Sequence, residues 1–138
     1  MDNRDARLNH LAIAVTDMDA AVAFYRDVLG LPLDRVEDVP DENAKVAFLP
    51  LGNGEIELVQ PTSDGTGVAK WLARHGPGMH HVAIQVRDLD ATVAHLKTAG
   101  VELTSPEPRR KADGTRYAFI HPKSAFGVLI ELYETGGG

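Results

Sequence analysis

The sequence has no cysteine, no long hydrophobic run and no excess of positive charge, and each absence excludes a class of protein. Without cysteine in its 138 residues, the chain has no disulfide, no thiolate metal site and no cysteine nucleophile. No apolar run approaches the roughly 20 residues that cross a bilayer, and the opening MDNRDARLNH is too polar for a signal peptide. With a net charge of −6 and no basic stripe, nucleic acid is not an expected partner. We therefore expect a cytoplasmic protein with neither membrane nor nucleic-acid partners.

The chain contains an internal repeat. At an offset of 71, residues 9–24 and 80–95 are identical at nine of 16 positions, where unrelated segments would share about one or two. The matches include His10 with His81, and later EIELV (55–59) matches LIELY (129–133), which puts Glu57 opposite Glu131. Repeats reveal architecture. We therefore predict one domain with the following parts: a module at 6–62, a helical connector at 63–76, a second module at 77–135 and a disordered tail at 136–138.

Each module is predicted to run strand, helix, then three strands. An alternating strand opens each module, Asp17 or Asp88 is the expected N-cap of the helix, and Gly30 or Gly100 its left-handed end. The later strands are expected at 32–38, 45–51 and 55–60 in the first module and at 101–104, 115–121 and 127–133 in the second. A polar loop is expected at 105–114. The connector is expected to hold one amphipathic helix ending at Gly76.

The repeated histidines and glutamates are expected to share one face of their strands. In each opening strand the aliphatic residues alternate with the histidine, so the histidine projects away from the core. The same alternation in EIEL and LIEL turns the glutamates to that side. If the two modules curl towards each other, four groups meet in one cavity, and neutral imidazoles with carboxylates suit Zn²⁺, Co²⁺, Ni²⁺ or Mn²⁺. The predicted metal ligands are His10, Glu57, His81 and Glu131.

A single strand histidine or glutamate is more often an ordinary surface residue than a ligand. The metal prediction depends on the recurrence of both types at matched places, because core positions persist easily in diverged repeats whereas polar positions need a separate reason. The other histidines differ. His80 alternates onto the aliphatic side and is expected to make a structural hydrogen bond, His75 and His95 are expected on helix surfaces, and His121 lies at a strand end near the cavity.

The chain resembles the vicinal oxygen chelate superfamily, which includes glyoxalase I. The segment NHLAIAVTDMDAAVAFYRDVLGL carries the superfamily resemblance, while VAKWLARHGPGMHHVAIQV and FIHPKSAFGVLIEL resemble its methylmalonyl-CoA epimerase branch. The resemblance spans residues 8 to about 134. It implies an α+β fold in which two tandem βαβββ modules form a cupped, incomplete β-barrel around a metal, with the same four ligands. It also implies a homodimer.

The reaction that the resemblance implies is interconversion of (2R)- and (2S)-methylmalonyl-CoA, an acyl-CoA substrate. Removal of the α-proton builds negative charge on the thioester oxygen, which a divalent cation stabilises, and epimerisation needs a base on each side of the α-carbon. Some relatives carry one base at the position that matches Val46 here. We therefore expect Glu131 as one base and Glu57 as the other. Lys123 and Ser124 are expected to bind the free carboxylate.

Three alternatives remain open from the sequence. A glyoxalase I-like lyase would act on a glutathione hemithioacetal with the same metal and the same proton abstraction. An extradiol dioxygenase would use iron with fewer protein ligands. A non-catalytic small-molecule-binding protein of this fold would need no metal set at all. The basic cluster Arg109, Arg110 and Lys111 is either a contact for coenzyme A phosphates or a solvated loop.

Overall fold

The computed structural model describes residues 2–134, which fall into two compact units. The N-terminal unit is His10–His80, and the C-terminal unit combines the residues up to Asn9 with those from His81 onward. Two strands, Arg7–Ala14 and Gly78–Gln85, cross the boundary and are described with the unit that holds most of their residues. The boundaries of the predicted repeat modules stay a prediction, and the predicted disordered tail at 136–138 lies outside the described residues. None of the helices in the described part of the chain is long and apolar enough to cross a membrane.

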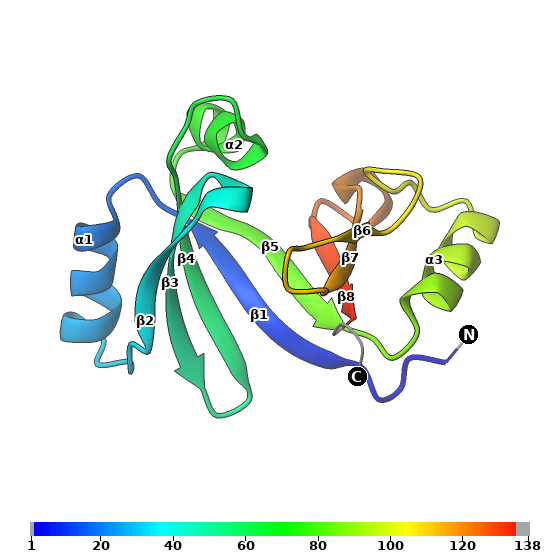
Figure 1. The fold of residues 1–138 in the computed structure, drawn as a ribbon, viewed down its shortest axis with the longest axis horizontal. Helices are drawn as coiled ribbons and strands as arrows, with labels where there is room; N and C mark the ends of the chain where they lie inside the picture. The colour runs from blue at the N-terminus through cyan, green and yellow to red at the C-terminus, as the bar shows by residue number, and fades with distance from the viewer. Residues whose placement is uncertain (1, 135–138) are drawn as a thin grey trace. The chain divides into compact units, whose positions relative to one another are not determined.

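The N-terminal unit is a mixed sheet with one helix against it (Figure 1). Its strands lie in the order β2-β3-β4-β1, with β1 parallel to β4 and the other neighbours antiparallel. The helix continues from an α-helical into a π-helical segment. The elements are β1 (Arg7–Ala14), α1 (Met18–Val22), the π-helical η1 (Ala23–Val28), β2 (Arg35–Val39), the 3-10 turn η2 (Pro40–Glu42), β3 (Ala44–Leu51), β4 (Gly54–Pro61) and α2 (Gly67–His75).

The C-terminal unit repeats this plan. Its strands lie in the order β5-β8-β7-β6, again with the first and last strands of the unit, β5 and β8, parallel and the rest antiparallel. The elements are β5 (Gly78–Gln85), α3 (Leu89–Thr98), β6 (Arg109–Arg110), β7 (Arg116–Ile120), the 3-10 turn η3 (Pro122–Ser124) and β8 (Ile130–Glu134). The α+β class is confirmed, and no pairing within residues 2–134 closes the strands into a barrel.

Each unit has its own hydrophobic core between the sheet and its helix. The alternating residues of the strands supply one side of each core, and the apolar stripe of the helix supplies the other. In the N-terminal unit the buried residues are Val15, Met18, Val22, Ala47, Leu49 and Leu58. In the C-terminal unit they are Val86, Leu89, Val93, Ala118, Ile120 and Leu132.

The N-caps and helix ends agree with the sequence prediction. Asp17 accepts a hydrogen bond from the Ala20 amide at 3.1 Å, and Asp88 accepts one from Ala91 at 3.0 Å. These bonds satisfy amides that the first helical turn leaves free. Gly30 and Gly100 have φ of 82° and 81°, the left-handed conformation that only glycine adopts without steric cost.

A hydrogen bond between the start of the helix and the last strand is also repeated in both units, and it was not predicted from the sequence. In the N-terminal unit the Met18 amide donates to Gln60 Oε1 at 2.7 Å, and in the C-terminal unit the Leu89 amide donates to Glu134 Oε1 at 3.3 Å. Gln60 and Glu134 each lie three residues beyond the repeated glutamate of their strand. The strand that carries the glutamate is therefore fixed to the start of the helix in both units.

The strand prediction was wrong in one region. Residues 101–104, predicted as a strand, contribute a single bridge between Leu103 and Ile120. The predicted loop 105–114 instead contains β6, whose Arg109 and Arg110 pair with β7. A tight turn returns the chain directly onto β7 and gives this polar stretch a strand partner, so tertiary pairing overrides its low β-propensity.

The first helix is also not uniform. After α1 the chain widens into η1, where the Leu29 amide donates to the carbonyl of Phe24, five residues back, at 2.8 Å. This wider turn shifts the helical face. Leu29, which stands at helical spacing from Val22 and Tyr25 in the sequence, is consequently 53% exposed, whereas Tyr25 packs against the core. The connector helix α2 ends at Gly76, as the sequence predicts.

Candidate active site

The N-terminal unit carries a buried histidine–carboxylate pair. His10 on β1 lies with its Nδ1 3.1 Å from Glu57 Oε2 on β4, and the two side chains are 6% and 18% exposed. The strands are parallel neighbours in which Ala12 pairs with Glu57. Ala12 is on the same face as His10, and its side chain is small.

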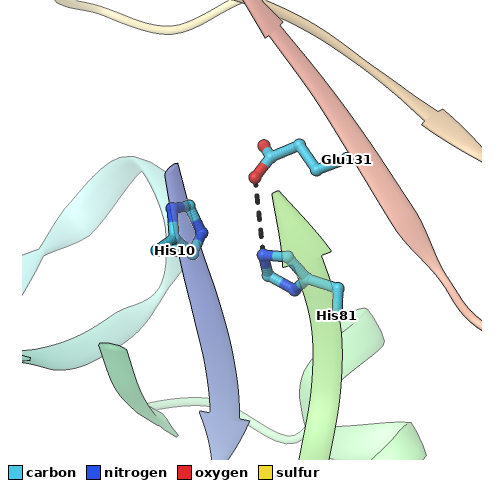
Figure 2. A group of neighbouring side chains, drawn as sticks. All are labelled: His10, His81 and Glu131. Atoms are coloured by element: carbon cyan, nitrogen blue, oxygen red, sulfur yellow. Dashed lines mark ion pairs between the residues drawn. The ribbon is translucent and has the colours of Figure 1, made fainter. Parts of the chain in front are cut away.

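The C-terminal unit carries the equivalent pair. Figure 2 shows Glu131 of β8 directed towards the imidazole of His81 on β5, with His81 Nε2 and Glu131 Oε1 3.4 Å apart. Their side chains are 14% and 3% exposed. Here Ala83 pairs with Glu131 across the parallel strands. The arrangement is therefore the same in both units: an alanine pairs with the glutamate, and the histidine stands two residues before that alanine.

Each histidine–glutamate pair also has a phenylalanine at the matching position of the neighbouring strand. Across the antiparallel ladder Phe48 is opposite Glu57, and Phe119 is opposite Glu131. Phe119 meets the His81 ring edge-on with ring centroids 5.6 Å apart. The Ala-Phe pairs in VAFLP and YAFIH match at the offset of 71, a signal from which these positions could have been found. Phe48 and Phe119 thus occupy matched positions opposite the two carboxylates.

The side chains of Val46 on β3 and Glu57 on β4 lie on the same face of the sheet. Val46 is two residues from Phe48 and is 3% exposed, and side chains two apart on a strand share a face. Val46 therefore shares a face with Phe48 and Glu57 but has no group that accepts a proton.

Lys111 brings a positive charge to the C-terminal pair. Its Nζ is 3.6 Å from Glu131 Oε2 and lies 5.3 Å and 6.0 Å from the ring centroids of Tyr117 and Tyr133. The two oxygens of Glu131 thus have different neighbours, His81 for Oε1 and Lys111 for Oε2. A buried carboxylate needs such partners to remain ionised.

The turn that carries Lys111 is held by its own hydrogen bonds. The Lys111 amide donates to the Thr115 carbonyl at 2.8 Å, and the Gly114 amide donates to the Lys111 carbonyl at 3.0 Å. The Thr115 amide donates to Asp113 Oδ1 at 2.9 Å, and this bond lowers the pKa of the Asp113 carboxyl below its usual value. The backbone at Lys111 is consequently well defined, unlike that of a free loop.

The predicted substrate-binding residues are engaged with Glu102. Lys123 Nζ is 3.6 Å from Glu102 Oε2, and the Lys123 side chain is 77% exposed. Ser124 Oγ accepts a hydrogen bond from the Glu102 amide at 2.9 Å. Both residues lie in η3, which precedes β8 and Glu131. Their role in binding substrate stays a prediction.

The remaining histidines occupy structural positions. His75 stacks on Trp71 with ring centroids 4.7 Å apart, and His80 meets the same indole edge-on at 5.4 Å. The hydrogen bond predicted for His80 stays a prediction. His95 is exposed on α3, as expected, and His121 Nδ1 accepts a hydrogen bond from the Lys123 amide at 3.0 Å.

Comparison with known proteins gives one consistent family. Residues 9–119 match the model of the Glyoxalase/Bleomycin resistance protein/Dioxygenase superfamily. The chain is 42% identical to the ethylmalonyl-CoA/methylmalonyl-CoA epimerase of Cereibacter sphaeroides, over 93% of this chain and 97% of the relative.

Solved structures agree with the sequence comparison. The crystal structure of methylmalonyl-CoA epimerase from Mycobacterium tuberculosis superimposes with a TM-score of 0.83 at 39% identity, covering 94% of this chain and 88% of that one. A methylmalonyl-CoA epimerase in complex with methylmalonyl-CoA and NH4+ gives 0.84 at 36% identity, covering 96% of both chains. The chain therefore belongs to the glyoxalase/bleomycin resistance protein/dioxygenase superfamily, and its relatives there include methylmalonyl-CoA epimerases.

Proposed function

We propose that this protein interconverts (2R)- and (2S)-methylmalonyl-CoA by removing the α-proton on one side and returning it on the other. The observation that carries the proposal is the buried histidine–glutamate pair in each unit of a chain whose relatives are named as epimerases of this substrate. Such pairs suit proton abstraction, because a carboxylate held in a fixed orientation by a neighbouring imidazole is positioned to accept a proton from a bound substrate.

The chemistry of the two pairs fits a divalent cation. His10, His81 and Glu131 each offer a nitrogen or oxygen donor of the kind that binds metal ions, and Glu57 offers a second carboxylate. A mixed set of this type accepts Co, Zn, Ni or Mn. We infer that all four residues hold one ion. Bound there, a divalent ion would supply Lewis acidity for the thioester oxygen, worth several kcal/mol in the transition state.

The two glutamates divide the proton transfers between them. Glu131, whose side chain is only 3% exposed, takes the α-proton of one epimer. Glu57 takes that of the other, since Val46 has no proton-accepting group and Glu57 is the counterpart of Glu131 in the repeat. Each transfer requires the carboxylate within hydrogen-bond reach of the α-carbon.

The substrate's free carboxylate is the proposed partner of Lys123 and Ser124. Lys123 is exposed enough to exchange its contact with Glu102 for an incoming anion, because an exposed ion pair contributes at most about 1 kcal/mol. A homodimer and a cytoplasmic location belong to the same proposal as inferences from the family resemblance.

The test is α-proton exchange. We expect the metal-loaded protein, incubated with methylmalonyl-CoA in D₂O, to incorporate deuterium at the α-carbon, and a chelator-treated sample to lose this activity until metal is restored. Mass spectrometry of the thioester measures the incorporation. No exchange despite bound metal would reject this substrate, and turnover of a glutathione hemithioacetal would then favour the glyoxalase-like alternative.

The division between the glutamates gives a separate prediction. Glutamine in place of Glu57 keeps an oxygen donor but cannot accept a proton, so Glu57→Gln is expected to retain metal and to slow exchange of one epimer about 10²-fold or more relative to the other. The measurement uses each purified epimer in D₂O, with metal content determined in parallel. Equal and minor effects on both epimers would show that Glu57 is not the second base.

A further inference from the structure

Lys111 differs from its two basic neighbours in the sequence. Arg109 and Arg110 are exposed, and Arg110 donates to the carbonyl of Gly114 at 3.1 Å on the surface. The Lys111 side chain is only 31% exposed and lies 3.6 Å from a carboxylate that is 3% exposed. The expectation of a solvated or phosphate-binding cluster therefore does not describe the contact that Lys111 makes.

The direction of Lys111 follows from the hairpin between β6 and β7. Arg109 pairs with Tyr117, and Arg110 pairs with Arg116, so the next residue continues the ladder opposite Thr115. Alternation puts Lys111 on the same face as Arg109 and Tyr117. That face is the one on which Phe119 is opposite Glu131, whereas Ala118 and Ile120 on the other face belong to the core.

The surroundings restrict the ammonium group to one side of Glu131. The Lys111 ammonium lies within 6.0 Å of the centroids of both tyrosine rings, and such cation–π contacts favour a fixed position. Glu131 Oε1 is directed to His81 and Oε2 to Lys111. Two different partners on two oxygens define the rotation of the carboxylate plane, which a single partner does not.

We infer that Lys111 is a positioning residue for Glu131, one that orients the carboxylate for proton transfer without contacting the metal. The inference rests on the proposed epimerase function and adds a residue to it. A carboxylate that both binds a cation and accepts a proton must present one oxygen to the cation and the other to the proton. Lys111, by pairing with Oε2, determines the orientation of the two oxygens. Outer partners of this kind typically contribute 10–100-fold to activity.

The test compares Lys111→Gln, Lys111→Arg and Lys97→Gln. Lys97 is the matched control, since it lies in the same unit, loses the same charge and pairs with the exposed Glu107 at 3.3 Å. For each protein we would measure kcat and KM for α-proton exchange with methylmalonyl-CoA. We would also titrate the chelator-treated protein with Co²⁺ to obtain the metal Kd, and check folding by circular dichroism.

Lys111→Gln is expected to lower kcat 10–100-fold with KM within about twofold of wild type. Its metal Kd should be unchanged or tighter, because a positive charge next to a cation ligand has been removed. Lys111→Arg should restore most of kcat, and Lys97→Gln should match wild type.

Several outcomes would overturn the inference. One is a kcat for Lys111→Gln within twofold of wild type, and another is a loss of metal binding parallel to the loss of kcat. A raised KM with kcat intact would instead make Lys111 a substrate-binding group. An inactive wild type would overturn the proposed function itself, and with it the inference. An active wild type with an equally active Lys111→Gln rejects only the inference.

Discussion

Glu131→Gln is expected to lower the rate of α-proton exchange about 10²–10⁴-fold for the epimer whose proton Glu131 removes. The glutamine amide has nearly the same shape as the carboxylate but accepts no proton. It keeps an oxygen donor, as Glu57→Gln does, so the metal content separates loss of the base from loss of the metal. Net epimerisation should fail in both directions, because each passes a proton to or from Glu131, whereas exchange of the other epimer through Glu57 should persist. Exchange in D₂O from each epimer measures the effect, with metal content measured beside it.

The control for this prediction is Glu107→Gln, which makes the same change at an exposed carboxylate in the same unit. It should leave the exchange rate within about twofold of wild type, as surface substitutions usually do. Two results would contradict the role given to Glu131. They are exchange of both epimers by Glu131→Gln at more than about a tenth of the wild-type rate, and an equal loss in Glu107→Gln.

Leu58→Ala is expected to lower the free energy of unfolding by about 2–5 kcal/mol. Leu58 is fully buried and belongs to the core of the N-terminal unit. It pairs with Ile13 on β1 and Ala47 on β3, so truncation leaves a cavity between strands that cannot collapse easily. The midpoint of urea denaturation, followed by circular dichroism, measures the loss.

Leu51→Ala provides the comparison for the core substitution. Leu51 is at the end of β3 and is 39% exposed, so its truncation should cost less than 1 kcal/mol. If the two variants unfolded at the same urea concentration, the core described for the N-terminal unit would be wrong. Leu58→Ala should also reduce activity in proportion to the unfolded fraction, because unfolding removes Glu57 from its place on β4.

Much of the fold follows from the sequence because the repeat records it twice. A strand, its capped helix and a glycine stop appear in each half, and local signals such as Asp17 and Gly30 determine where each helix begins and turns. Even the parallel pairing of β4 with β1 is consistent with a connection long enough to include a helix. Each element is predicted from two matching segments, so a wrong prediction in one half disagrees with the prediction for the other half.

The regions that sequence reasoning missed are those without a local signal. Nothing in EPRRKADG alternates, and β6 exists only because β7 offers it a partner. The exposure of Leu29 depends on one widened helical turn, which the apolar spacing cannot reveal. A strand partner decides the structure in the first place and a single helical hydrogen bond decides it in the second, and propensity gives only a weak prior.

The candidate site also combines features that the sequence pattern predicts with one that depends on tertiary contacts. Alternation and repetition, which are properties of the sequence, predicted that each histidine shares a face with the glutamate of its module, and the His10–Glu57 and His81–Glu131 contacts agree with this. The contact of Lys111 with Glu131 was not, since Lys111 stands in a polar loop next to two arginines that do point to solvent. Its direction depends on the register of a two-residue strand, and a shift of one residue would reverse it.

The parallel pairing within each unit has a kinetic consequence. The histidine and glutamate of each pair are about fifty residues apart in sequence, and their strands are the first and the last of the unit. Contacts of such high sequence separation form late, because loop closure must precede them. The unfolded chain consequently holds no preformed ligand pair, and a metal ion is expected to slow unfolding rather than to accelerate folding.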